Sequence, residues 1–234
     1  MTLSPTLLKK ILAHATHEFP REACGVIVTS HGRDAYLPCV NLAQNNEHFV
    51  IDPADYAAAE DKGEVTAIVH SHPITAPNPS QADLIGIEKS GIPWVIVNPL
   101  SGAHTITNPT GYTAPLIGRE FSHGVLDCLT LIQDYYLSIG IQLPQSEREN
   151  EWWLKGQNLY LDLYEAWGFV EVAEPQLHDV VLIKMGSPVP NHGAIYLGDN
   201  IILHHVMRRL SCRDVFGGYW QRHATHYLRH KDLM

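Results

Sequence analysis

The sequence predicts an α+β protein with two domains, and three patterns lead to this fold class. In the first half, an amphipathic helix is followed by strand-like runs that alternate with short helices. In the second half, helices come first and a small antiparallel sheet follows. Between the halves, residues 108–118 (NPTGYTAPLIG) are rich in Gly, Pro and Thr, a composition typical of a linker. We therefore place one domain at residues 1–110 and the other at residues 117–234.

The first half is expected to begin with a helix at residues 5–18. Ser4 suits the N-cap, and Pro5 suits the first helical position because proline lacks an N–H there. Strand-like runs follow, and the apolar run at 65–70 indicates a strand that is buried on both faces. The helix presents one apolar stripe, formed by Leu7, Leu8, Ile11, Leu12 and Ala15. The expected strands lie at residues 23–29, 35–40, 49–51, 65–70, 93–98 and 104–107.

Two further helices are expected between these strands. Asp52 and Pro53 open a short helix that runs through Glu60. Ser80 is the predicted N-cap of the next helix, which ends near Gly91 because glycine favours a helix C-terminus.

The second half is predicted to contain two helices and then three strands. The helices are expected at residues 126–139 and about 147–167. The last two strands are joined by a turn at Gly198-Asp199-Asn200, a sequence suited to a hairpin. The expected strands lie at residues 180–183, 193–197 and 201–206.

Composition and charge narrow the function classes. The chain of 234 residues is 45% hydrophobic and 18% charged, which is typical of a globular protein. Its net charge is −9, and no run of Lys and Arg occurs, so the electrostatic footprint of a nucleic-acid binder is absent. No apolar stretch approaches the length of a membrane span. The N-terminus is too polar for a signal peptide, so we expect synthesis in the cytoplasm.

A first group of candidate site residues surrounds the sequence HSHP. His70 and His72 stand at the end of the buried strand, where alternation places both imidazoles on one side. Asp83 lies in the first turn of the helix that Ser80 caps. Two neutral imidazoles and a carboxylate are a typical Zn²⁺ ligand set that leaves one position for water, and Glu22 is the candidate base. The alternative is two ordinary strand histidines near a helix-start aspartate.

This pattern, E…HxHP…S-x-x-D, resembles the signature of the JAMM metallopeptidases, which include deubiquitinases and their prokaryotic relatives. The resemblance covers roughly residues 1–107 and implies an αβ domain with a mixed sheet. It implies His70, His72 and Asp83 as zinc ligands and Glu22 as the general acid/base. It also implies that Ser80 helps to hold the oxyanion of the tetrahedral intermediate.

A second group centres on Cys128, which opens the helix LDCLTLIQDYY. The helix dipole stabilises a thiolate at that position, although a free cysteine is also a common buried residue. His192 begins an expected strand, and the hairpin can bring it close to a histidine twelve residues later. One imidazole would then activate the thiol while the other orients the first. The pattern alone does not decide between His204 and His205.

This half resembles the NlpC-type cysteine peptidases, which are papain-like cell-wall enzymes. The matching features are the Asp-Cys helix start, the run DVVL before the first histidine, and HGAIYLG leading to a second histidine. The resemblance covers roughly residues 119–234, selects His204 by its spacing, and implies Cys128, His192 and His204 as catalytic residues. It implies cleavage of peptidoglycan stem peptides beside D-glutamate.

The remaining cysteines and aromatic residues are given structural interpretations. Cys24, Cys39 and Cys212 have no metal-finger or redox spacing, so we expect reduced thiols. An aromatic cluster at helical spacing is expected to be core or a partner-facing surface. Its members are Trp152, Trp153, Tyr160, Tyr164 and Trp167.

The order of the two motifs in one short chain resembles the tail assembly protein K family of phages related to lambda. That resemblance implies a place at the tail tip, partners among tail-tip proteins and a role in opening the cell wall. Two classes of function follow: a peptidase with a cysteine site and a zinc site, or an assembly factor that uses both folds as binding surfaces. Complete ligand and nucleophile sets favour the enzyme, because binding alone does not require them.

Overall fold

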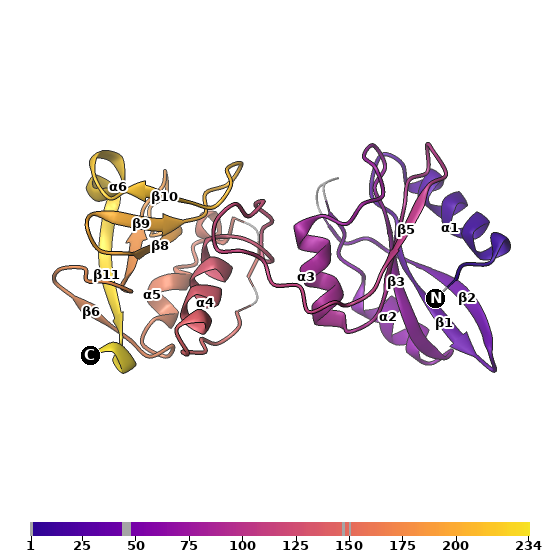
Figure 1. The fold of residues 1–234 in the computed structure, drawn as a ribbon, viewed down its shortest axis with the longest axis horizontal. Coiled ribbons are helices and arrows are strands. Elements are labelled where there is room, and N and C mark those ends of the chain that lie inside the picture. Colours follow the sequence, from indigo (N-terminus) through magenta and orange to yellow (C-terminus); the bar gives the residue numbers. More distant parts are fainter. Residues whose placement is uncertain (1, 44–47, 147, 150) are drawn as a thin grey trace. The chain divides into compact units, whose positions relative to one another are not determined.

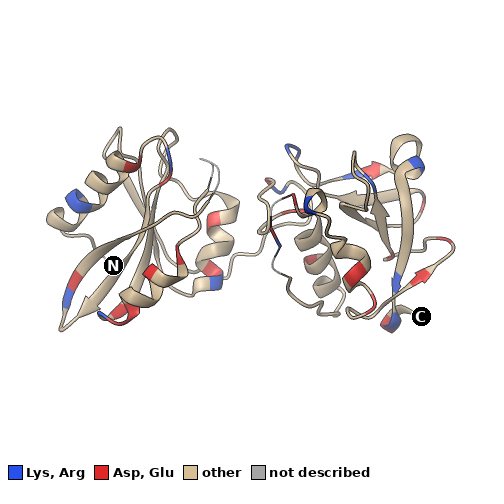
Figure 2. Cartoon of the chain, turned by 180° about the vertical axis from the view of Figure 1, so that it is seen from behind, with Lys and Arg blue, Asp and Glu red and all other residues tan. Residues whose placement is uncertain are grey.

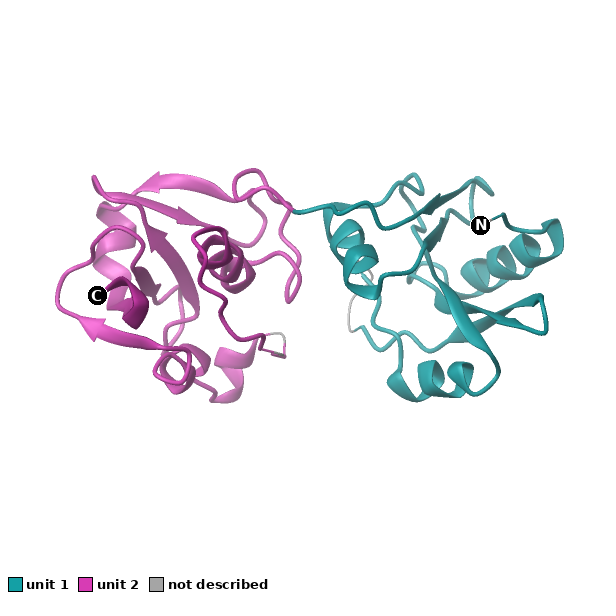
Figure 3. Cartoon of the chain, turned by 60° about the horizontal axis from the view of Figure 1, so that its bottom comes forward, with its two compact units in different colours: residues 1–113 teal, residues 114–234 magenta. Residues whose placement is uncertain are grey.

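The computed structural model describes residues 2–43, 48–146, 148–149 and 151–234. The chain divides into two compact units, Met1–Thr113 and Ala114–Met234 (Figure 3). Among the described residues, no helix combines the length and the hydropathy needed to cross a membrane. Lys and Arg positions are scattered among Asp and Glu positions in both units (Figure 2).

The first unit is a five-stranded mixed sheet with helices on both faces (Figure 1). The strand order is β2-β1-β3-β4-β5, in which only β3 and β4 are parallel neighbours. This confirms the predicted mixed sheet. The strands are β1 (Cys24–Ser30), β2 (Arg33–Cys39), β3 (Glu64–Ser71), β4 (Trp94–Val97) and β5 (His104–Thr107).

Three helices cover this sheet. Helix α1 (Pro5–Glu18) packs on one face, and helices α2 (Pro53–Glu60) and α3 (Gln81–Ser90) pack on the other. Strand β3 is buried between the layers, as its apolar sequence predicts: Val69 contacts the α1 side and Ile68 the opposite side. The cap assignments are also confirmed, since the Ser4 and Asp52 side chains accept N–H bonds at their helix starts.

The second unit packs a helix against a six-stranded antiparallel sheet. The strand order is β10-β9-β8-β7-β11-β6, which confirms the predicted α+β class. The helices are α4 (Cys128–Ser138), α5 (Leu159–Leu163) and α6 (Gly218–His223), with 3-10 turns at Trp152–Lys155 and Lys231–Leu233. The strands are β6 (Phe169–Val172), β7 (Val180–Ile183), β8 (His192–Tyr196), β9 (Ile201–His204), β10 (Cys212–Val215) and β11 (Ala224–His230).

The predicted hairpin of the second unit is confirmed. Strands β8 and β9 pair antiparallel, with Tyr196 opposite Ile202. The turn residues Gly198, Asp199 and Asn200 all have positive φ, a conformation that Gly, Asp and Asn tolerate best.

Two predicted elements are wrong. Residues 49–51 form no strand, and only Ile51 makes an isolated bridge, to Asn41. The helix expected at 147–167 is two short helical segments, with residues 147 and 150 outside the described residues. The chain changes direction where Glu151 and Gly156 adopt positive φ, which a continuous helix cannot contain.

Candidate active sites

The end of β3 is held firmly in the first unit. Ser71 donates its backbone N–H to Ala23, and its hydroxyl accepts the N–H of Ala23, so two bonds fix the strand end to the segment before β1. The Asn98 side chain donates to the carbonyl of His72 at 3.0 Å. These bonds set the direction of the two imidazoles on either side of Ser71, with His70 only 1% exposed.

Asp83 is positioned by a reciprocal cap at the start of α3. The hydroxyl of Ser80 accepts the backbone N–H of Asp83 and donates to its Oδ2 at 2.8 Å. The backbone N–H of Ser80 also donates to Oδ2, at 2.7 Å. Burial alone would raise the pKa of Asp83, but hydrogen bonds from His70 and His72 hold that pKa well below its usual range. The cap therefore delivers an ionised carboxylate to the site.

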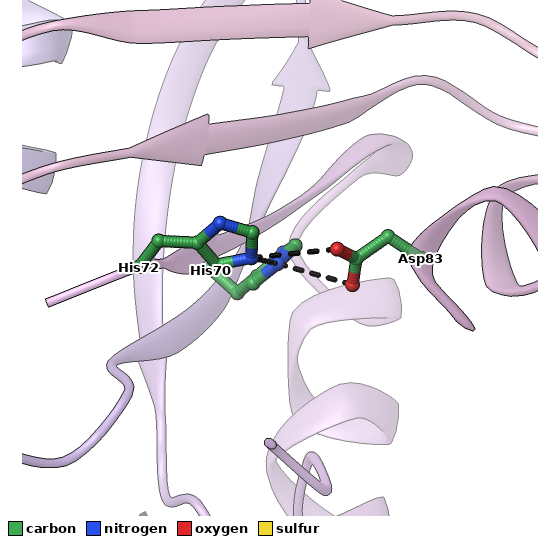
Figure 4. Close-up of side chains that lie close together, drawn as sticks. All are labelled: His70, His72 and Asp83. Carbon is green, nitrogen blue, oxygen red and sulfur yellow. Dashed lines mark hydrogen bonds and ion pairs between the residues drawn. The ribbon is translucent and has the colours of Figure 1, made fainter. Parts of the chain in front are cut away.

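The two imidazoles and this carboxylate converge on one point (Figure 4). Nε2 of His70 lies 3.1 Å from Nε2 of His72, and the two nitrogens lie 3.3 and 3.4 Å from the Asp83 oxygens. Tetrahedral zinc with bonds of roughly 2.0–2.1 Å keeps neighbouring ligand atoms about 3.3–3.4 Å apart. The donor set and its spacing fit a zinc ion.

The second hydrogen bond of His72 agrees with that fit, and aromatic rings enclose His70. Nδ1 of His72 lies 3.1 Å from the carbonyl oxygen of Ala76, an arrangement that directs Nε2 toward a metal. Phe49 stacks on the His70 ring at 4.6 Å between centroids, and Trp94 meets it edge-on. Burial lowers the pKa of His70, so the ring is the neutral form that binds metals.

Glu22 lies just before β1, where the Asn41 side chain donates to its carbonyl at 2.9 Å. Its side chain is buried, and burial raises the pKa of Glu22 to about 7. The charge of His72 lowers that pKa and the charge of Asp83 raises it further, so the carboxyl of Glu22 interacts electrostatically with both side chains. A carboxyl with a pKa near neutrality can both take up and release a proton under working conditions.

In the second unit, Cys128 is the first residue of α4. The Asp127 side chain caps the helix by accepting the N–H groups of Leu129 and Thr130, and it is ion-paired with Arg148. The Cys128 thiol lies 3.3 Å from the hydroxyl of Tyr160. Burial, and then the charge of Asp127, raise the pKa of Cys128. At this helix start, burial therefore favours the neutral thiol of Cys128 over the thiolate.

The two histidines join across the hairpin. Nε2 of His192 lies 3.1 Å from Nδ1 of His204, and Nε2 of His204 lies 3.0 Å from Oδ2 of Asp214. Burial, followed by the neighbouring His204, lowers the pKa of His192 to about 3. His205 makes neither contact: among the described residues neither of its buried ring nitrogens has a hydrogen-bond partner, and its ring meets Phe121 edge-on.

Cys128 and His192 line one pocket of the second unit. Its other lining residues include aromatic side chains, the Arg148–Asp127 pair and His205. The aromatic lining comes from Phe121, Trp152, Trp153 and Tyr160. Trp152 and Tyr160 are also core residues, so the aromatic cluster expected to be core additionally forms a wall of the pocket.

Sequence reasoning missed several residues that support the two groups. Asp214, Tyr160 and Arg148 contact His204, Cys128 and Asp127 respectively. The sequence gives little indication of these three residues, because each belongs to a different segment of the chain from its partner and to none of the motifs. Asn98 could have been noted as a polar residue that directly follows a buried strand.

Comparisons with known proteins match both units. Residues 4–110 match the prokaryotic homologs of the JAB domain, and residues 118–229 match the NlpC/P60 family. One relative, the tail tip assembly protein K of Escherichia phage N15, is 40% identical over 228 residues, covering 95% of this chain and 93% of the relative.

Two further relatives cover less of the chain. The tail tip assembly protein K of Escherichia phage lambda is 42% identical over 183 residues, covering 77% of this chain and 89% of the relative. The CysO-cysteine peptidase of Mycobacterium tuberculosis is 29% identical over 92 residues, covering 36% of this chain and 63% of that protein.

Proposed function

We propose that this chain, which belongs to the tail tip assembly protein K family of phages N15 and lambda, is a bifunctional peptidase of a phage tail tip. In this proposal the second unit cleaves peptidoglycan stem peptides, and the first unit is a zinc-dependent peptidase. Both act in a protein that also takes part in tail assembly among other tail-tip proteins. The observation that carries the proposal is the pocket shared by Cys128 and His192, with His204 hydrogen-bonded behind His192.

The cysteine site can carry out acyl transfer with its own residues. His192 would take the thiol proton of Cys128 as the sulfur attacks the peptide carbonyl, forming a thioester and breaking the C–N bond. The protonated His192 would then give that proton to the leaving amine. Water, deprotonated by His192, would then attack the thioester carbonyl, the C–S bond would break, and His192 would return the proton to the Cys128 sulfur. Burial raises the pKa of Cys128 and lowers that of His192, which favours the neutral pair before the peptide binds.

The first unit would hold zinc through His70, His72 and Asp83. Bound there, zinc would supply Lewis acidity toward the peptide carbonyl and a water molecule. Glu22 would take a proton from the attacking water and return it to the leaving amine, as its pKa near neutrality permits. The Ser80 hydroxyl, which donates to Asp83, would turn its proton toward the developing oxyanion.

The second candidate function is a tail-tip assembly factor that uses both folds for binding. Complementation of a phage that lacks this gene separates the two candidates. The chain that carries both Cys128→Ala and Glu22→Gln is expected to lose most of its plaque formation, whereas a Cys39→Ala control retains it. The control removes a buried thiol of the first unit, outside the pocket lining.

Particle counts by electron microscopy complete this experiment. If the double variant assembles tails, and its particles adsorb to cells but form no plaques, the result would support the peptidase. Full plaque formation by the double variant, together with loss of tails in the deletion, would support the assembly factor instead.

A further inference from the structure

A diagonal row of polar side chains crosses three neighbouring strands of the second sheet. His204 on β9 is opposite Ala194 on β8 and Cys212 on β10. Because side chains two residues apart share a face, His192 and Asp214 lie diagonal to His204 on either side. This register explains why one imidazole can contact both a second imidazole and a carboxylate.

The row has one consistent arrangement of protons when His204 is neutral. A carboxylate only accepts, so Nε2 of His204 must donate to Oδ2 of Asp214 across their 3.0 Å separation. A neutral ring carries a single N–H, so Nδ1 of His204 must accept. Its partner at 3.1 Å, Nε2 of His192, is then the donor. That leaves Nδ1 of His192 unprotonated and able to act as the base.

The surroundings exclude water from the two histidines of this row and hold the Asp214 carboxylate in place. His204 is fully buried, and the Trp220 ring meets it edge-on at 4.5 Å between centroids. Burial lowers the pKa of His204, which agrees with a neutral ring. The guanidinium of Arg209 approaches the same Oδ2 of Asp214 at 3.4 Å, so the carboxylate is held from the solvent side as well.

We propose that Asp214 is a positioning residue of the cysteine site, which sets the tautomers of His204 and His192 so that an unprotonated Nδ1 serves Cys128. The inference rests on the proposed peptidase function. It adds Asp214 to Cys128, His192 and His204 as a fourth residue of the site. When His192 accepts the thiol proton, the positive charge is shared along the row and stabilised by the Asp214 carboxylate.

The test measures the rate at which iodoacetamide alkylates Cys128 in the full chain, resolved by peptide mass spectrometry across pH. This reaction needs the thiolate but no natural substrate. Asp214→Asn is expected to slow alkylation near neutral pH by about 10-fold, which corresponds to a rise of about one unit in the apparent pKa of the thiol. The pH at which the alkylation rate is half-maximal should rise, because a less stable imidazolium on His192 stabilises the Cys128 thiolate less.

Controls isolate the effect of Asp214. The other titratable groups that face the pair are unchanged in the variant; they are Asp127, Arg148, Tyr160, His204 and His205. Asp199→Asn is the matched control, since Asp199 is an exposed turn residue with positive φ that asparagine tolerates. Asp214→Glu should recover part of the rate. Equal rates for Asp214→Asn and Asp199→Asn would overturn the proposal.

A measurement on the unaltered chain keeps the proposal testable if Asp214→Asn misfolds. Nitrogen-15 histidine spectra at neutral pH should give both His192 and His204 as Nε2–H tautomers; an Nδ1–H signal for His204 would contradict the proposal. Failure of the peptidase function has a different signature. Absence of stem-peptide cleavage, with the expected alkylation pattern intact, would refute the substrate class and leave the role of Asp214 standing.

Discussion

A double variant with His70→Ala and His72→Ala is expected to lose zinc binding. The purified protein should contain about one zinc ion per chain, because two imidazoles and the Asp83 carboxylate converge with tetrahedral spacing. A bound metal stabilises the fold by about 4 kcal/mol when free zinc exceeds Kd a thousandfold. Elemental analysis by mass spectrometry measures the metal, and thermal unfolding with and without a chelator measures its contribution.

The chelator arm separates metal loss from packing loss. His70 is buried against Phe49, so alanine there also leaves a cavity that lowers stability by itself. The chelator should lower the melting temperature of the natural sequence and leave that of the double variant unchanged. A control with His17→Ala and His104→Ala, two exposed histidines of the same unit, should bind zinc normally. Zinc-free natural protein, indifferent to chelator, would contradict the metal site.

Replacing His192 with alanine is expected to reduce the rate of stem-peptide cleavage by about 10²- to 10⁴-fold. The reason is that the Cys128 pKa is raised by burial and the charge of Asp127, so the thiol reacts only if a neighbouring base removes its proton. Cleavage rates with purified stem peptides measure the effect. His226→Ala, on β11 of the same sheet and outside the pocket lining, is the control.

His204→Ala and His205→Ala form a second comparison in the same assay. His204 contacts His192, whereas His205 does not, so only the first variant should lower kcat strongly. A His192→Ala enzyme as fast as the control would show that the base is assigned to the wrong residue. A larger loss in His205→Ala than in His204→Ala would show that the orienting histidine is assigned wrongly.

Much of the first unit could be predicted because its signals are local. Ser4, Asp52 and Ser80 each bond to an N–H within three residues, so the cap and the helix start can be read from neighbouring letters. His70 and His72 lie at the end of a strand whose apolar run predicts its burial. The same local logic placed Asp83 one turn into α3, beside the two imidazoles.

The errors come from residues whose structure depends on distant parts of the chain. Trp152 and Tyr160 are spaced like one helix face, yet both reach the core from two short segments separated by a turn at Gly156. Phe49 has the β propensity of a strand residue, but its ring instead packs on His70. Asp214 lies on an edge strand with exposed positions, so nothing near it indicates the contact with His204.

The cleavage of stem peptides that we propose for the second unit is tested most directly on its polymeric substrate. The measurement is a digest of purified peptidoglycan, read by mass spectrometry, with the natural sequence, Cys128→Ala and a Cys39→Ala control from the first unit. We expect products cut within the stem peptide for the natural sequence and the control, and none for Cys128→Ala. A folded natural protein that yields no such products, or a Cys128→Ala variant that yields the same ones, would contradict a cysteine peptidase in the second unit.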